Sequence, residues 1–190
     1  AKFGNMNFKG TFTGLYNDFY AYGTFTSALG KLATDIALKH NYKTDKDLYT
    51  GNLKATDFDL GKLFNSSLLG KTTANIDIDG EGFNMENVKA KLNGTIQSIL
   101  FNNYAYKNIK IGGDAAKRIF EGKLNVKDDN VDLNFNGTVD FTDNLPKLNF
   151  GSTLKKANLN ALHFVNDTIN KSIISTQLIS IITGNTINNL

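Results

Sequence analysis

The chain of 190 residues has no cysteine, no tryptophan and a single proline. The lack of cysteine excludes a disulfide framework and thiol chemistry. No apolar run approaches the ~18 residues of a membrane span, and no secretory signal pattern opens the sequence. The net charge is only +3, from 21 basic and 18 acidic residues that are interspersed, which argues against nucleic acid as the main partner.

Two Asn-Gly pairs, at 93–94 and 136–137, carry the strongest short-range signal for a β-hairpin. A turn at 136–137 would place Leu133 opposite Asp140, which pairs apolar with polar side chains on one face. If the strand continues instead, alternate residues over 131–141 are apolar and share one face. We therefore predict that the chain runs straight through both pairs.

Glycines recur inside these predicted strands, always on the apolar face. Their spacings lie near one or two multiples of roughly 14 residues, which is about one strand of ~10 residues plus a turn. A glycine in mid-strand weakens the strand and removes a packing side chain, so we expect another group to need the space. The recurring glycines are Gly10, Gly23, Gly51, Gly80, Gly94, Gly122 and Gly137.

The pattern predicts an all-β fold: an elongated, curled meander, or open β-groove, with an apolar concave face, formed by residues 1–190 as one unit. The predicted strands are 6–13, 19–27, 31–40, 48–56, 72–80, 87–96, 97–101, 106–112, 119–127, 130–141, 147–155 and 172–183.

Two segments, 58–71 and 159–171, lose the alternation, and we expect each to hold a short helical turn or a bulky lip. Few but ordered identities at an offset of 102 residues suggest a duplication, with sub-repeat boundaries near 55 and 157. The end of the chain is ambiguous, because apolar residues between 165 and 174 could also line one side of an amphipathic helix. We favour a strand for 172–183.

Apolar residues in phase with the glycines are the candidate lining of a trough that could hold acyl chains. These candidate lining residues are Phe8, Phe12, Phe25, Ile36, Leu38, Leu53, Ile76, Ile78, Val88, Leu92, Ile96, Ile109, Ile111, Phe120, Leu124, Val126, Val131, Leu133, Phe135, Val139, Phe141, Leu148 and Phe150.

Four stretches of the chain carry a family resemblance. They are 10–38, 55–84, 88–113 and 120–162, and they include the phrases FDLGKL and KANLNAL. These stretches resemble the translocation and assembly module family TamB in its Bacteroidetes form. The resemblance implies an AsmA-like repeating β-groove, or β-taco, protein of the Gram-negative envelope. Such proteins are anchored in the inner membrane and cross the periplasm toward an outer-membrane barrel partner. It further implies phospholipid transport along the groove and a link to outer-membrane protein assembly and secretion. The family's anchor helix and barrel-contacting end are not recognisable in these residues.

No motif for catalysis or metal binding is complete. Asp77, Asp79 and Glu81 fit the start of a calcium loop, but position 12 is Val88 where a bidentate Glu is required. The two histidines, His40 and His163, lie outside any catalytic pattern. We therefore expect no enzyme activity, no metal and no cofactor.

Two alternatives to the open groove remain at this stage. The same sheet could close over its own core and act as a structural or β-augmentation scaffold for outer-membrane strands. A carbohydrate-active β-helix enzyme is disfavoured, because no carboxylate cluster recurs across adjacent strands. In either the groove or the scaffold, exposed edge strands are expected to pair with a second copy of the chain.

Overall fold

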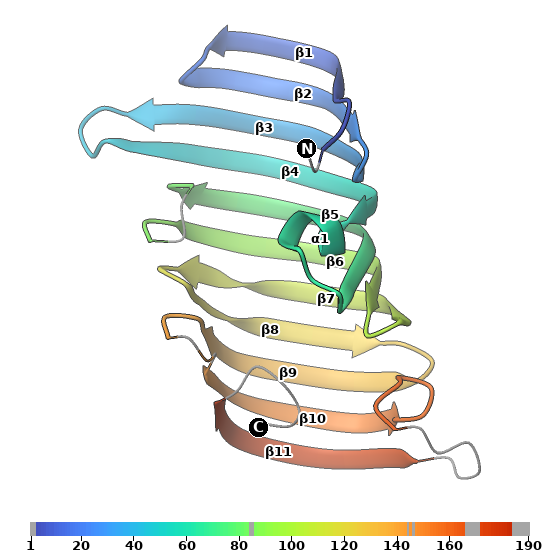
Figure 1. Ribbon diagram of the computed structural model, residues 1–190. Coiled ribbons are helices and arrows are strands. Elements are labelled where there is room, and N and C mark those ends of the chain that lie inside the picture. The colour runs from blue at the N-terminus through green and yellow to red at the C-terminus, as the bar shows by residue number, and fades with distance from the viewer. Residues whose placement is uncertain (1–2, 84–85, 144, 146, 166–171, 184–190) are drawn as a thin grey trace.

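The computed structural model describes residues 3–83, 86–143, 145, 147–165 and 172–183. It is an all-β fold in which 11 antiparallel strands form one open sheet in chain order (Figure 1), which confirms the predicted all-β class and meander order with one strand fewer than the twelve predicted. The elements are β1 (Asn7–Leu15), β2 (Asp18–Ser27), β3 (Gly30–Asn41), β4 (Lys46–Asp59), α1 (Leu60–Phe64), β5 (Leu69–Glu81), β6 (Lys89–Phe101), β7 (Tyr104–Ala116), β8 (Ile119–Lys127), β9 (Val131–Asp140), β10 (Lys147–Asn158) and β11 (Ile173–Thr183).

The chain runs straight through both Asn-Gly pairs. Gly94 lies inside β6 and is paired with Ile76 and Ile111, and Gly137 lies inside β9 and is paired with Gly122 and Phe150. One boundary is wrong: 87–96 and 97–101 form a single strand, β6. The alternation breaks there because the β5–β6 register shifts by one residue next to Gln97, which is a bulge and not a turn.

The end of the described chain is a strand. β11 pairs antiparallel with β10 over Ile173–Thr183, so the helical alternative is wrong for these residues, while 166–171 lie outside the described residues. The ladder with β10 supplies the backbone hydrogen bonds of this segment, and this contact outweighs the helical periodicity.

Both segments that lose the alternation hold irregular structure at the end of a strand. In the first, α1 begins after Asp59, whose side chain accepts a hydrogen bond of 2.9 Å from the backbone N–H of Lys62. It ends at Asn65, which has a left-handed backbone (φ 56°). In the second, residues 159–164 form successive turns after β10. The predicted short helical turn is confirmed for the first segment.

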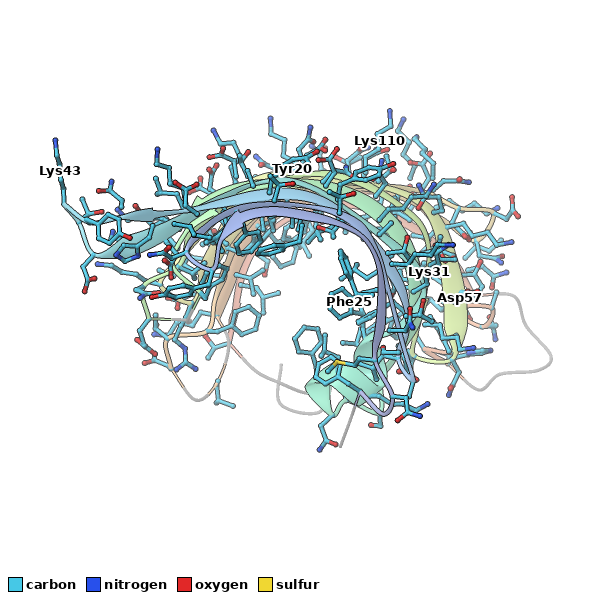
Figure 2. The ribbon with its side chains drawn as sticks, turned by 90° about the horizontal axis from the view of Figure 1, so that it is seen from above. Tyr20, Phe25, Lys31, Lys43, Asp57 and Lys110 are labelled. Atoms are coloured by element: carbon cyan, nitrogen blue, oxygen red, sulfur yellow. The ribbon has the colours of Figure 1, made fainter. Side chains whose placement is uncertain are left out.

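Register shifts lie near a common level in the β4–β5, β5–β6, β9–β10 and β10–β11 pairings. They follow Ala55 in β4, Thr73 in β5 and Leu154 in β10, and Ala55 is paired with Ala74 of β5. Each bulge adds a residue to one strand, bends it and increases its twist. The strands are bent in the view along the stack (Figure 2), and this includes β1 and β2, whose pairing has no register shift.

The buried core sits at one margin of the sheet, beyond these bulges. Its fully buried members come from β7 to β10 and from the turn segment 159–165. They are Ile109, Val126, Val131, Ala157 and Leu162.

Candidate functional site

One face of the sheet carries most of the apolar side chains, and we call it the apolar face. Strand pairing aligns these residues into rows that run across the sheet from strand to strand. One such row consists of Leu53, Ile76, Gly94, Ile111, Leu124 and Phe135. Because the register does not slip between strands along this row, the apolar face continues from β4 to β9.

The candidate lining residues lie in strands with two exceptions. Val88 directly precedes β6 and Phe141 directly follows β9. Most are half-buried, and at the β1 end the rings are more open, with Phe12 53% exposed. A folded protein of this size leaves scattered apolar atoms exposed, but here they are contiguous along the rows, which is unusual for a surface without a partner.

Three candidate lining residues are in the core instead. Ile109, Val126 and Val131 are almost fully buried, and Leu162 from the turn segment 159–165 packs with them. The turn segment is held to the β6–β7 turn, because Nδ2 of Asn102 donates to the carbonyl oxygen of His163 at 3.1 Å. At this margin the apolar face is covered by the chain itself and is closed to a ligand.

Aromatic rings occupy the space beside several of the mid-strand glycines, whereas a Cβ at Gly51 or Gly94 would meet the backbone of the neighbouring strand. A Cβ at Gly122 would lie 2.6 Å from Cζ of Phe120, and one at Gly113 would lie 2.8 Å from the same atom. At the other end of the sheet, Cζ of Phe8 would lie 2.8 Å from a Cβ at Gly23. The glycines therefore let rings lie flat on the sheet, an arrangement that supports a glycine in a strand.

The sequence analysis predicted these phenylalanines as lining residues but did not predict that they fill the space beside the glycines, although a Phe two residues before a Gly was visible in the pattern. They also contact each other across strands. The ring centroids are 5.2 Å apart for Phe8 and Phe25, and 5.0 Å apart for Phe135 and Phe150. Such pairs contribute beyond their burial, so aromatic packing stabilises the apolar face even where it is open to solvent.

The opposite face is polar. Figure 2 shows Tyr20, Lys31 and Lys110 pointing away from the side to which Phe25 points. Cross-strand pairs on this face include Asn125 Nδ2 donating to Asn134 Oδ1. Asn and Lys side chains there are solvated, and we call this the polar face.

Two of the three acidic residues of the calcium-like stretch, Asp77 and Glu81, have partners. Asp77 accepts a hydrogen bond of 2.7 Å from Nδ2 of Asn52. Glu81 accepts one of 2.5 Å from Nζ of Lys46, and this contact lowers the pKa of the carboxyl. Within the described residues no group of three or more His, Cys, Asp or Glu side chains could hold a metal ion.

Each histidine has a structural neighbour. Nδ1 of His40 lies 2.8 Å from Oδ1 of Asp47 in the margin formed by β3 and β4. Nδ1 of His163 lies 3.2 Å from the carbonyl oxygen of Asn102 and helps to hold the turn segment. Neither arrangement brings a nucleophile to the imidazole.

Two tyrosines at the core margin have raised pKa values. Burial raises the pKa of Tyr106 to about 12, with Tyr104 and Asp128 as lesser causes. Burial is also the main cause that raises the pKa of Tyr104, whose hydroxyl donates to Asp128. The two rings meet edge to face at 4.8 Å, so they are packing residues with a polar end and not an acid-base pair.

No helix among the described residues is long and apolar enough to cross a membrane. Comparison with known proteins finds no matching family model, no matching curated protein and no matching solved structure.

Proposed function

We propose that this chain is a periplasmic segment of a TamB-like, AsmA-like β-groove protein that shields phospholipid acyl chains during transport between membranes. In this proposal the sheet is curled, its apolar face is concave, and the transport supports outer-membrane protein assembly and secretion. The observation that carries the proposal is the apolar face itself, which is contiguous across strands and half-exposed.

The arch of the strands supports the concave geometry. In Figure 2, Phe25 lies on the inner side of the arch, while Tyr20 and Lys110 lie on the outer side. Residues in phase with Phe25 therefore belong to the inner side. With strands spaced ~4.8 Å apart, the described strands give a path on the order of 50 Å long.

The chemistry of the two faces suits lipid. Each CH₂ group that leaves water gains about 0.8 kcal/mol, so an acyl chain lying along the rows is stabilised without any specific polar contact. The polar face keeps the outside of the sheet in water. Transfer would be passive exchange along the rows, with no catalytic residue and no cofactor. The membrane anchor and the barrel partner would belong to family segments not recognisable here.

A scaffold role in outer-membrane protein assembly, without lipid, is the competing proposal. It draws support from the rings that fill the space beside the glycines, because each filled site leaves less room for an acyl chain. The half-exposed rows favour lipid, since a scaffold does not need them open.

The decisive experiment compares two carboxylates placed on opposite faces of β9. Val139→Asp puts a charge on the apolar face, where Val139 is paired with Phe120 and Leu148. Asn136→Asp puts the same charge on the polar face opposite Lys123. Native mass spectrometry with lipid extraction is applied to the proteins purified from a bacterial envelope, and circular dichroism reports the fold.

We expect phospholipid with the wild type and Asn136→Asp, and at least a fivefold loss with Val139→Asp, because a buried carboxylate is costly beside acyl chains. If Val139→Asp does not fold, Phe12→Asp tests the same face at a half-exposed position. A well-folded wild type without lipid overturns the proposal and favours the scaffold.

A further inference from the structure

The turns between the strands lie along two margins of the sheet. One margin holds α1, the β6–β7 turn at 102–103 and the turn segment 159–165, and we call it the walled margin. The other holds the β1–β2, β3–β4, β5–β6, β7–β8 and β9–β10 turns, and we call it the open margin. The two margins differ in what the chain places over the apolar face.

The walled margin is covered by two segments of the chain. Figure 1 shows α1 in front of the ends of β5 and β6, and Figure 2 shows it on the inner side of the arch. Gly61 of α1 is buried, and a Cβ there would lie 2.2 Å from the carbonyl oxygen of Leu69 at the start of β5. The turn segment 159–165 follows β10 and buries Leu162 in the core. Together the two segments form a wall beside β4 to β10.

The two wall segments occupy equivalent places in the sequence. At the offset of 102 residues, Leu60 of α1 corresponds to Leu162, and Ala55 of β4 corresponds to Ala157 of β10. A register shift lies next to each of these alanines. Because β4 and β10 run in the same direction in an antiparallel meander, both segments leave the sheet at the same margin. The wall therefore belongs to the repeat.

Asn102, in the β6–β7 turn, joins the two wall segments. Its backbone N–H donates to the carbonyl oxygen of Leu68, which follows α1, at 2.9 Å. Its Nδ2 donates to the carbonyl oxygens of His163 at 3.1 Å and Leu162 at 3.4 Å. The backbone of Asn102 is left-handed (φ 48°), a conformation that asparagine adopts more readily than most residues. One side chain thus connects the turn segment to a turn that is itself bonded to the α1 region.

Burial of the apolar face decreases from the walled margin to the open margin. Along β9 and the residue that follows it, Val131 is 4% exposed at the walled end and Phe141 is 44% exposed at the open end. Among the described residues, Tyr49 and Ala90 are the buried side chains of the open half. The buried side chains of the walled half are Leu29, Thr72, Ala74, Ile109, Val126, Val131, Ala157 and Leu162.

The described turns of the open margin do not fold over the apolar face in the same way. The β1–β2 and β7–β8 turns have two residues each, 16–17 and 117–118, which is too short to reach across it. Figure 2 shows Lys43 of the β3–β4 turn pointing away from the arch. Phe83 provides local cover, because its ring stacks on Tyr49 with centroids 5.0 Å apart. The open half of the face therefore stays accessible over most of its length.

The rim of the open margin carries ion pairs between exposed side chains. Nη1 of Arg118 lies 3.7 Å from Oε1 of Glu86, and Nζ of Lys147 lies 2.5 Å from Oδ2 of Asp143. Exposed pairs of this kind contribute little to stability, so their charges can exchange partners with the phosphate and amine of a zwitterionic headgroup. The rim thus offers both signs of charge next to accessible apolar surface.

We propose that phospholipid enters and leaves the groove across the open margin, with its headgroup at the ion-paired rim and its acyl chains directed toward the wall. In this arrangement Asn102 is a positioning residue that keeps the opposite margin shut. The inference rests on the proposed lipid transport and adds the side of entry. It holds whatever lies beyond the first and last strands, because the rows of the apolar face run along the stack between the two margins.

Single tryptophans can report which margin the acyl chains approach, because the chain has no tryptophan. Phe141→Trp at the open margin and Phe164→Trp at the walled margin form a matched pair, since the two rings are 44% and 41% exposed. Each protein is loaded from phosphatidylcholine vesicles with brominated acyl chains, which quench tryptophan fluorescence on contact. Gel filtration then removes the vesicles, and a phosphate assay measures bound lipid. We expect at least threefold stronger quenching for Phe141→Trp than for Phe164→Trp.

The role of Asn102 is tested in the Phe164→Trp background. Asn102→Gly removes the side chain and keeps a residue that adopts the left-handed backbone without strain. Asn103→Gly is the matched control, because Asn103 is the next residue and is also left-handed (φ 61°). We expect at least a threefold rise in quenching with Asn102→Gly and no change with Asn103→Gly. If circular dichroism shows that Asn102→Gly does not fold, His163→Gly removes the contact from the other side, at a left-handed position (φ 60°).

The outcomes separate this inference from the proposed transport. Bound lipid with equal quenching at both tryptophans, or stronger quenching of Phe164→Trp, would overturn the side of entry and leave lipid transport standing. Bound lipid with the same quenching for Asn102→Gly and Asn103→Gly would overturn the role of Asn102. A folded protein that retains no lipid would overturn the proposed transport itself, and this inference with it.

Discussion

The substitution Leu162→Ala should destabilise the protein by about 3 kcal/mol. Leu162 belongs to the turn segment 159–165, is 2% exposed and packs onto Ile109, Val126 and Val131 of the sheet. The change removes three carbon atoms at about 0.8 kcal/mol each, and the cavity left in a close-packed site adds to this loss. The estimate lies within the range of about 2–5 kcal/mol observed for buried Leu→Ala changes.

Urea unfolding followed by far-ultraviolet circular dichroism measures this loss, with Leu68→Ala as control. Leu68 is 51% exposed, so its truncation should cost less than about 1 kcal/mol. A loss below about 1 kcal/mol for Leu162→Ala would refute the view that the turn segment closes the core margin. In that case residues such as Ile109 would be open to a ligand after all.

Three further predictions concern protonation, capping and glycine packing. Because burial raises the pKa of Tyr106 from 10.0 to about 12, its neutral form favours the folded state below pH 10. That contribution, about 1–2 kcal/mol after allowance for partial exposure, should disappear as the pH rises to about 12. Urea titrations of the wild type against Tyr106→Phe across this range measure it. Asp59 caps α1, and the hydrogen bond from the Lys62 N–H lowers the pKa of the Asp59 carboxyl in the folded state. The stabilising effect of the cap is therefore present above the pKa that Asp59 has in the unfolded chain, and it is lost as the pH falls through the lower pKa of the folded state. Asp59→Ala should lower the urea midpoint at pH 7 and leave it nearly unchanged at pH 2, whereas an equal loss at both would contradict the capping role. Gly122→Ala should destabilise by about 1–3 kcal/mol, because the added carbon meets both the Phe120 ring and the carbonyl oxygen of Gly112. Gly151→Ala, where the added carbon meets open space, should be neutral or stabilising in the same assay.

Most of the fold was accessible from alternation alone. The two-residue period predicted straight strands through Gly94 and Gly137, and it remained readable because one face is apolar throughout β6 and β9. It failed at Gln97, where a bulge shifts the register and reverses the faces without any turn residue to mark it. A single sequence does not distinguish such a bulge from a strand boundary.

The candidate lining was harder to predict, because alternation identifies a face but not what lies over it. Val131 and Phe135 have the same phase in β9, yet Val131 is buried under the turn segment and Phe135 is half-exposed beside Phe150. Their difference arises from the contact between Asn102 and His163, which are 61 residues apart. Long-range contacts of this kind leave no local pattern in the sequence.

The strictly sequential strand order also bears on how the protein acquires its structure. Each strand pairs with its predecessor and successor in the chain, so every ladder closes only a short loop and the contact order of the sheet is low. Such a sheet can lengthen strand by strand as the polypeptide emerges from a ribosome or a translocation channel, without waiting for a distant segment. The link between Asn102 and His163 is an exception, so the 159–165 margin should be acquired late, and hydrogen exchange during refolding should show its amides protected last.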